Sequence, residues 1–202
     1  MPGNKVAPRF LPIIVILALA TFSRVEAQLT TDSASRMSGA DYRSGLEQET
    51  FSLVNRYRKT HELSLLAWDD SIAKVARAHS KDMATGEVDF GHEGFSDRID
   101  YLKTVMTGLW GAGENVLMTS EPDQVAQRAV ALWVRSPHHL ENIRGDYNYS
   151  GLGVWQDKNG AIYFTQIFVK IRTLAEETQT DPMPSVITPF GMLTTPNTRA
   201  RP

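Results

Sequence analysis

The chain has 202 residues, of which 42% are hydrophobic and 22% are charged, and its formal net charge is −2 at pH 7. These values are typical of a globular protein with one core, and the small negative charge argues against a nucleic-acid partner and against a strong preference for anionic lipid. The sequence contains no cysteine, which excludes thiolate catalysis and cysteine-based zinc sites.

The N-terminus has the pattern of a secretory signal peptide. The cations Lys5 and Arg9 precede a short apolar run, and Val25 and Ala27 place small residues before a cleavage site. The run is too short to cross a bilayer of about 30 Å as a helix, so a retained anchor is the weaker alternative. We expect residues 1–27 to be removed, which changes the formal net charge from −2 to −4. The mature protein is then predicted to be secreted, extracellular or periplasmic, without a transmembrane anchor.

Polar segments flank the predicted domain on both sides. Residues 28–44 are rich in Ser, Thr and Asp, and they are predicted to form a flexible linker. Residues 172–202 carry repeated prolines among threonines without a sustained period, which predicts a disordered tail. The folded domain is therefore predicted to span residues 45–171, and we expect a monomer.

Two helices are predicted in the first half of the domain. Apolar side chains at helical spacing predict the first from about Leu46 to His61. Asp69 or Asp70 is expected to cap the second, which ends near Gly86. The buried stripe of this second helix is predicted to contain Ile72, Val75, Ala76, His79 and Met83.

Two further helices are predicted in the second half. Ser120 is expected to cap a third helix with Pro122 in its first turn. The apolar face of that helix is predicted to contain Val125, Ala126, Ala129, Val130 and Trp133. Ser136-Pro137 then ends it and begins a short helix that reaches Arg144.

Three segments have strand character. Residues 149–156 and 161–170 are β-branched and aromatic runs joined by Asp157-Lys158-Asn159-Gly160, and Asn-Gly at this place is a strong hairpin signal. Residues 112–118 are predicted to form a third strand. Because the strands are apolar on both faces, helices are expected on both sides of them. The predicted fold class is α+β, a three-layer α-β-α sandwich around a small antiparallel sheet.

Eight short motifs follow one another along the predicted domain. In chain order they are Leu53-Val54-Asn55-x-Tyr57-Arg58, Leu66-x-Trp68-Asp69, Ala76-x-x-His79-Ser80-x-Asp82-Met83, Phe90-Gly91-His92, Gly113-Glu114-Asn115-Val116, Trp133 followed by Ser136-Pro137-x-His139-x-x-Asn142-Ile143, Gly151-x-Gly153, and Tyr163-x-Thr165-Gln166. This order resembles the bacterial branch of the CAP superfamily, which also includes cysteine-rich secretory proteins, insect venom antigens and plant pathogenesis-related proteins. The resemblance covers nearly all of residues 51–170 and implies the same α-β-α sandwich.

The resemblance also implies a cleft. Animal and plant members carry two histidines and two glutamates there, and His92 and Glu114 match one of each. Ser136 and Tyr163 stand where the second glutamate and the second histidine would be, so Tyr163 is expected to line the cleft without acting as a ligand.

The bacterial pattern implies one more cleft residue. In that pattern a histidine follows Ser-Pro-Gly on a helix, and His139 matches it. His138 takes the place of the glycine, and we treat it as a neighbour of the cleft for which a solvent-facing side chain is the simpler interpretation. The resemblance therefore implies a cleft that contains His92, Glu114 and His139.

Two interpretations of this trio stay open. Two neutral imidazoles and one carboxylate suit a divalent cation such as Zn²⁺, with an open position for water or ligand. The same three groups are also compatible with a hydrogen-bonded, pH-sensitive cluster that holds no metal. Elsewhere, His79 is predicted to be a hydrogen-bonded core histidine, and Arg98 to form either a local ion pair with Asp97 or a solvated pair.

Three functions are compatible with these features. The sequence has no Gly-x-Ser-x-Gly elbow, no His-Glu-x-x-His helix and no thiol, which favours a secreted module that binds a divalent metal, lipid or glycan ligand without turning it over. One alternative is a metal-dependent hydrolase, a peptidase or esterase, in which Glu114 accepts a proton from a metal-bound water. The other is an envelope-associated structural or interaction protein that uses the Pro-rich tail.

Overall fold

A computed structural model describes residues 38–172 of the chain. The elements, in chain order, are α2 (Gly39–Thr60), β1 (Ala67–Trp68), α3 (Asp70–Thr85), α4 (Phe95–Val105), β2 (Leu109–Thr119), α5 (Val125–Arg135), α6 (Pro137–Arg144), β3 (Tyr149–Gln156) and β4 (Ile162–Ile171). The predicted signal peptide, most of the predicted linker and the predicted tail beyond residue 172 lie outside the described residues. No helix within residues 38–172 has the length and apolar character needed to cross a membrane.

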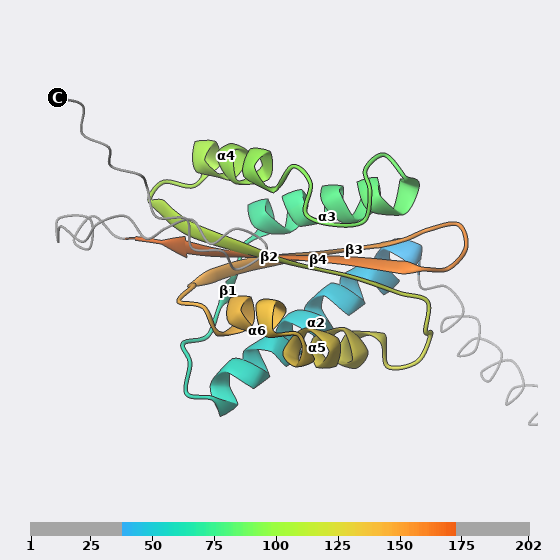
Figure 1. Ribbon diagram of the computed structural model, residues 1–202, viewed down its shortest axis with the longest axis horizontal. Coiled ribbons are helices and arrows are strands. Elements are labelled where there is room, and N and C mark those ends of the chain that lie inside the picture. Colours follow the sequence, from blue (N-terminus) through green and yellow to red (C-terminus); the bar gives the residue numbers. More distant parts are fainter. Residues whose placement is uncertain (1–37, 173–202) are drawn as a thin grey trace, which may run out of the picture. The chain divides into compact units, whose positions relative to one another are not determined.

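A four-stranded sheet in the order β1-β3-β4-β2 forms the middle layer. Helices α3 and α4 cover one face of the sheet, and α2, α5 and α6 cover the other (Figure 1). This arrangement confirms the predicted α+β class and the three-layer α-β-α sandwich.

The sheet is mixed rather than wholly antiparallel. β2, β4 and β3 are antiparallel neighbours, whereas the two-residue strand β1 runs parallel to the start of β3. The sequence indicated only an apolar connection at this place. The connection becomes a strand because the N–H groups of Ala67 and Asp69 donate to the carbonyls of Asn148 and Ser150 at 2.8 and 3.1 Å.

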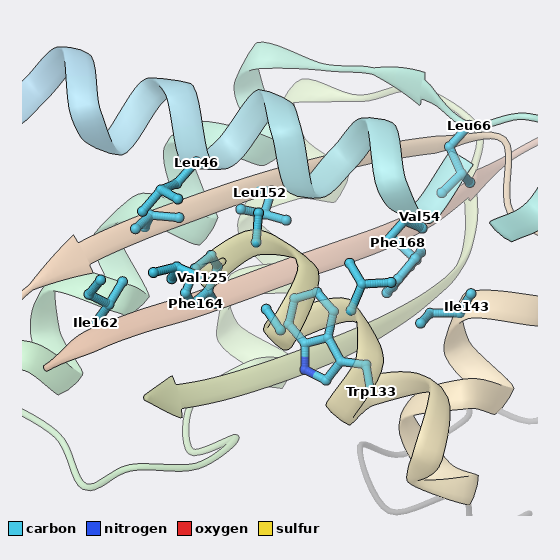
Figure 2. Packing of buried hydrophobic residues seen from close by; sticks show 14 of the residues in the cluster. Leu46, Val54, Leu66, Val125, Trp133, Ile143, Leu152, Ile162, Phe164 and Phe168 are labelled. Carbon is cyan, nitrogen blue, oxygen red and sulfur yellow. The ribbon is translucent and has the colours of Figure 1, made fainter. Parts of the chain in front are cut away.

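Each face of the sheet has its own apolar core. Between the sheet and the helices α2, α5 and α6, the Trp133 ring packs edge-on against Phe164 at a centroid distance of 6.4 Å, and Phe168 and Leu152 are fully buried beside them (Figure 2). Between the sheet and the helices α3 and α4, the buried residues are Ile72, Val75, Ala76, Phe95, Ile99, Leu102, Ala112, Ile167 and Val169. Burial on both faces explains the continuous apolar strands of the sequence.

The predicted second helix is confirmed as α3. The side chain of Asp69 accepts a hydrogen bond from the N–H of Ile72 at 3.0 Å, and Gly86 ends the helix in the left-handed conformation with φ of 78°. All five residues of the predicted stripe are buried. The predicted hairpin is also confirmed, since β3 and β4 flank the turn and the Asp157 carboxylate accepts from the N–H groups of Asn159 and Ala161.

Helix α3 lies directly on β3. A Cβ on Gly151 would be 2.2 Å from the nitrogen of Ala73, and one on Gly153 would be 2.1 Å from the nitrogen of Arg77. Real Cβ atoms do not approach backbone this closely, so this part of β3 requires glycine.

The first helix begins earlier than predicted. Helix α2 starts at Gly39 rather than Leu46, so the last residues of the predicted linker are helical. Ser38 and Asp41 stabilise this start reciprocally, because the Ser38 hydroxyl accepts from the N–H of Asp41 and the Asp41 carboxylate accepts from the N–H of Ser38, both at 3.1 Å.

Two other helices also differ from the prediction. Helix α5 begins at Val125, not at Ser120. Gln124 has a left-handed backbone with φ of 50°, which separates residues 120–123 from the helix. Helix α4 was not predicted from the sequence. The short helix after Ser136 is confirmed as α6.

Candidate ligand-binding site

The site is built around Glu114 on the edge strand β2. Successive side chains of a strand point to opposite faces, so Ala112, Glu114 and Val116 face α3 and α4. Asn115 faces the other way, toward α6. Glu114 is fully buried, with 0% of its side chain exposed.

Both carboxylate oxygens of Glu114 accept hydrogen bonds. Arg98 of α4 donates from Nη2 to Oε1 at 2.8 Å and from Nε to Oε2 at 3.0 Å. His92, in the loop before α4, places Nδ1 3.0 Å from Oε1. His92 and Arg98 have side chains that are 12% and 13% exposed. The structure therefore brings the predicted residues His92 and Glu114 into direct contact, and it adds Arg98 to them.

Arg98 does not form the local pair with Asp97 that the sequence suggested. Its guanidinium turns inward to Glu114, and its Nη1 donates to the carbonyl of Glu93 at 2.7 Å. The sequence gives little indication of this contact. It requires α4, which was not predicted, and Glu114 is 16 residues away from Arg98 along the chain. We refer to His92, Arg98 and Glu114 as the carboxylate cluster.

His79 supports the loop that carries His92. Its Nε2 lies 2.9 Å from the carbonyl oxygen of Gly91, and the residue is 3% exposed. Burial lowers the pKa of His79, and the nearby charge of Arg98 lowers it further. This confirms the prediction of a hydrogen-bonded core histidine.

His139 approaches the cluster from the opposite helical layer. Helix α6 is attached to the edge of β2, where Asn115 donates to the carbonyl of His139 at 3.0 Å and Asn142 donates to the carbonyl of Glu114 at 3.0 Å. The half-buried His139 has a lowered pKa, first because of burial and then because of the neighbouring charges of His92 and His138. His139 therefore lies within electrostatic range of His92, while His138 is exposed, as the sequence suggested.

Tyr163 lies on the same sheet face but farther along it. It is paired with Met118, four residues beyond Glu114 in β2, which corresponds to roughly 13 Å along the strand. Its ring contacts that of Phe90 at a centroid distance of 6.4 Å. Tyr163 is thus part of the face that carries Glu114 but is remote from the carboxylate cluster.

A metal-binding role for His92, Glu114 and His139 stays a prediction, and two features of residues 38–172 bear on it. No group of three or more acidic or histidine side chains within residues 38–172 is placed to hold a metal ion. Glu114 already binds the guanidinium of Arg98 through both oxygens, and a second cation at the same oxygens would be repelled by it. A metal would have to displace Arg98 first.

An open groove gives solvent access to the outer side of the cluster. It has a volume of about 570 Å³ and lies along α3 and α4. Its lining includes His79, Arg98 and the carboxylates of Asp82, Glu93 and Asp97. A ligand in this groove would meet Arg98 rather than Glu114.

Comparison with known proteins identifies the family. The family model described as the cysteine-rich secretory protein family, CAP, matches residues 51–168. Because this match covers more than half of the chain, the chain belongs to the CAP family, and the predicted resemblance is confirmed.

Two curated relatives come from Bacillus subtilis strain 168. The uncharacterized protein YkwD is 29% identical over 128 residues, which are 62% of this chain and 48% of YkwD. The uncharacterized membrane protein YlbC is 32% identical over 127 residues, which are 61% of this chain and 34% of YlbC. The chain thus spans less than half the length of either relative.

Solved structures show the same fold. An extracellular protein with an SCP domain from Bacillus anthracis is 32% identical, with a TM-score of 0.54 over 65% of this chain and 42% of that chain. An outer surface protein from Borrelia burgdorferi is 21% identical, with a TM-score of 0.50 over 60% of this chain and 90% of that chain. At this identity the second likeness concerns the fold alone.

Proposed function

We propose that the protein is a secreted CAP-domain binding module that holds a ligand at Arg98 and the adjoining groove without turning it over. One observation carries the proposal. Glu114 is fully buried, and both of its oxygens are engaged by Arg98 and His92. A carboxylate held in this way positions other side chains and does not itself meet a ligand.

The cluster presents hydrogen-bond donors in a fixed arrangement. A guanidinium has five N–H groups. Arg98 donates three of its N–H groups to the carboxylate of Glu114 and to the carbonyl of Glu93. Its other N–H groups remain for a ligand in the groove. Donors whose rotamers are locked by such contacts bind acceptors with little loss of entropy. Because Asp82, Glu93 and Asp97 also line the groove, the ligand is expected to carry neutral hydroxyl or carbonyl oxygens, which glycans and lipid head groups share.

Secretion is part of the proposal. It rests on the signal-peptide pattern of residues 1–27 and on the similar Bacillus anthracis structure, which is described as an extracellular protein. No observation within residues 38–172 favours the hydrolase alternative, in which Glu114 would have to accept a proton from water while both oxygens already accept from Arg98 and His92.

Calorimetry on the mature chain tests the proposal. The probes are a soluble N-acetylglucosamine tetramer, dihexanoyl phosphatidylglycerol below its micellar concentration, and ZnCl₂. We expect one of the two organic probes to bind, Arg98→Ala to weaken it at least tenfold, and mass spectrometry to find the probe unchanged. Arg135→Ala on the exposed face of α5 is the matched control and should bind as the wild type does.

Three results would contradict the proposal. They are no binding of either organic probe, equal loss in Arg98→Ala and Arg135→Ala, and cleavage of the probe. The ZnCl₂ titration tests whether the site binds a metal. Micromolar zinc binding that is lost in His92→Ala, Glu114→Ala and His139→Ala would support a metal site instead. The geometry predicts no such binding while Arg98 holds Glu114.

A further inference from the structure

An exposed apolar surface lies at the end of the sheet face that carries Glu114. Trp155 of β3 is paired with Tyr163 of β4, which is paired with Met118 of β2. Residues directly opposite each other on neighbouring strands point to the same face about 5 Å apart. The ring of Phe90 contacts the ring of Tyr163 edge to face, with a centroid distance of 6.4 Å. We call these four residues the apolar row.

Helix α3 covers only the Trp155 end of the apolar row. The helix contacts β3 at Gly151 and then at Gly153, one helical turn later. Trp155 is the next residue on that face, and Lys81, one helical turn after Arg77, reaches its indole. Phe90 and Met118 are accordingly 52% and 44% exposed, and Trp155 and Tyr163 are half-buried.

Two cations sit at the Trp155 end of the row. The Arg43 guanidinium carbon is 4.3 Å from the centroid of the indole, and the Lys81 ammonium is 5.6 Å from it. Within residues 38–172, neither cation forms an ion pair with a carboxylate. Their positive charges are therefore available to an anionic partner.

We propose that the apolar row, together with Arg43 and Lys81, contacts the head-group region of an anionic membrane. Tryptophan and tyrosine are enriched at membrane–water interfaces because their rings are amphipathic, and basic residues beside them are attracted to anionic lipids. The surface shares no residue with the carboxylate cluster, so this proposal and the proposed function can be tested separately.

The acidic net charge of the chain does not oppose this contact. Removal of the signal peptide is expected to leave a charge of −4, which argues against a general attraction to anionic lipid. At physiological ionic strength, however, exposed charges are screened beyond about 8 Å. Arg43 and Lys81 therefore set the charge at the Trp155 end of the row, and Asp89, next to Phe90, contributes a negative charge at the other end.

Vesicle co-sedimentation of the mature chain tests this proposal. The probes are vesicles of phosphatidylcholine alone and vesicles with 30% phosphatidylglycerol. We expect binding to the anionic vesicles that weakens with salt. A double variant, Arg43→Gln with Lys81→Gln, should lower the partition coefficient about thirtyfold, since each cation near the surface contributes about fivefold. The control is Arg128→Gln with Arg135→Gln on the exposed face of α5, which should leave binding unchanged.

The apolar part needs its own variant. Phe90→Ser with Met118→Ser should weaken binding at least fivefold and abolish any blue shift of tryptophan emission on vesicles. Equal binding to both vesicle types, or equal loss in the α5 control, would overturn the proposal. So would dextran sulfate binding as tightly as vesicles while Phe90→Ser with Met118→Ser changes nothing, because the partner would then be a soluble polyanion. Circular dichroism melts verify that each variant is folded.

Discussion

At the scale of single residues, Glu114 and Arg98 define the site. The carboxylate is fully buried and the guanidinium is 13% exposed, with two hydrogen bonds of 2.8 and 3.0 Å between them. Removing both charges from water costs several kcal/mol per ion, and close pairing offsets that cost. Either group alone in this place would be a buried charge without its counter-ion.

Replacing Arg98 with Met should therefore destabilise the fold by about 3–5 kcal/mol, because it leaves the charge of Glu114 buried. Urea unfolding followed by circular dichroism measures this change. Lys103→Met, in the exposed pair with Asp100, is the control and should change stability by less than about 1 kcal/mol. A loss for Arg98→Met no larger than that of the control would show that the pair is solvated.

His139 should make the stability pH-dependent. Burial and the charges of His92 and His138 lower its pKa in the folded state. The unfolded chain then binds the proton more readily, so the contribution is complete above the unfolded pKa of about 6.5 and is lost as the pH falls through that value toward the folded pKa. The free energy of unfolding should decrease from pH 7.5 to pH 5.

His139→Gln should flatten this decrease, and urea unfolding at several pH values measures it. His61→Gln, at an exposed position at the end of α2, is the matched control and should leave the slope unchanged. The same slope in wild type and His139→Gln would contradict the prediction and assign the dependence to His79, whose pKa is lowered as well.

At the scale of elements, two contacts fix the layers. Helix α3 packs on β3 without intervening side chains at Gly151 and Gly153. Glu47 of α2 is buried, binds Arg77 of α3 at 2.7 Å, and accepts from the N–H of Val154 at 3.1 Å. Because β1 is only two residues long, this carboxylate satisfies an amide on the edge of β3 that no strand pairs.

Gly153→Ala should destabilise the fold by about 1–3 kcal/mol or more, because the new Cβ would lie 2.1 Å from the backbone of α3. Thermal unfolding measures the effect. Gly45→Ala in α2 is the matched control, since a Cβ there meets nothing within 4 Å, and it should stabilise the helix by about 0.5–1 kcal/mol. An unchanged melting temperature in Gly153→Ala would mean that α3 can move away from β3.

At the scale of the whole molecule, the two proposed binding surfaces lie on one sheet face. The carboxylate cluster lies beneath α4, and the apolar row lies farther along the face, toward the β3–β4 turn. The first is proposed to offer fixed donors to a small ligand, and the second to offer aromatic rings and the cations Arg43 and Lys81 to a membrane. A domain that uses both would bind its ligand while it is held at a membrane.

The sequence by itself determined the features that depend on neighbouring residues. Asp69 caps the start of α3 and Gly86 ends it. Asn159-Gly160 lies in the turn between β3 and β4, and the ordered motifs identify the family. The placement of His92 and Glu114 in one site also followed from those motifs. Caps, tight turns and motif order are local, because each is set by residues within a few positions of one another.

Only the tertiary structure decided the partner of Arg98, the start of α5 and the existence of the apolar row. Arg98 lies 16 residues from Glu114, and Trp155, Tyr163 and Met118 meet only through strand register. Such contacts depend on which strands are neighbours and on how the helices lie over them. No local pattern of residues carries that information, because the free energy that selects these contacts comes from packing the sheet between its two helical layers.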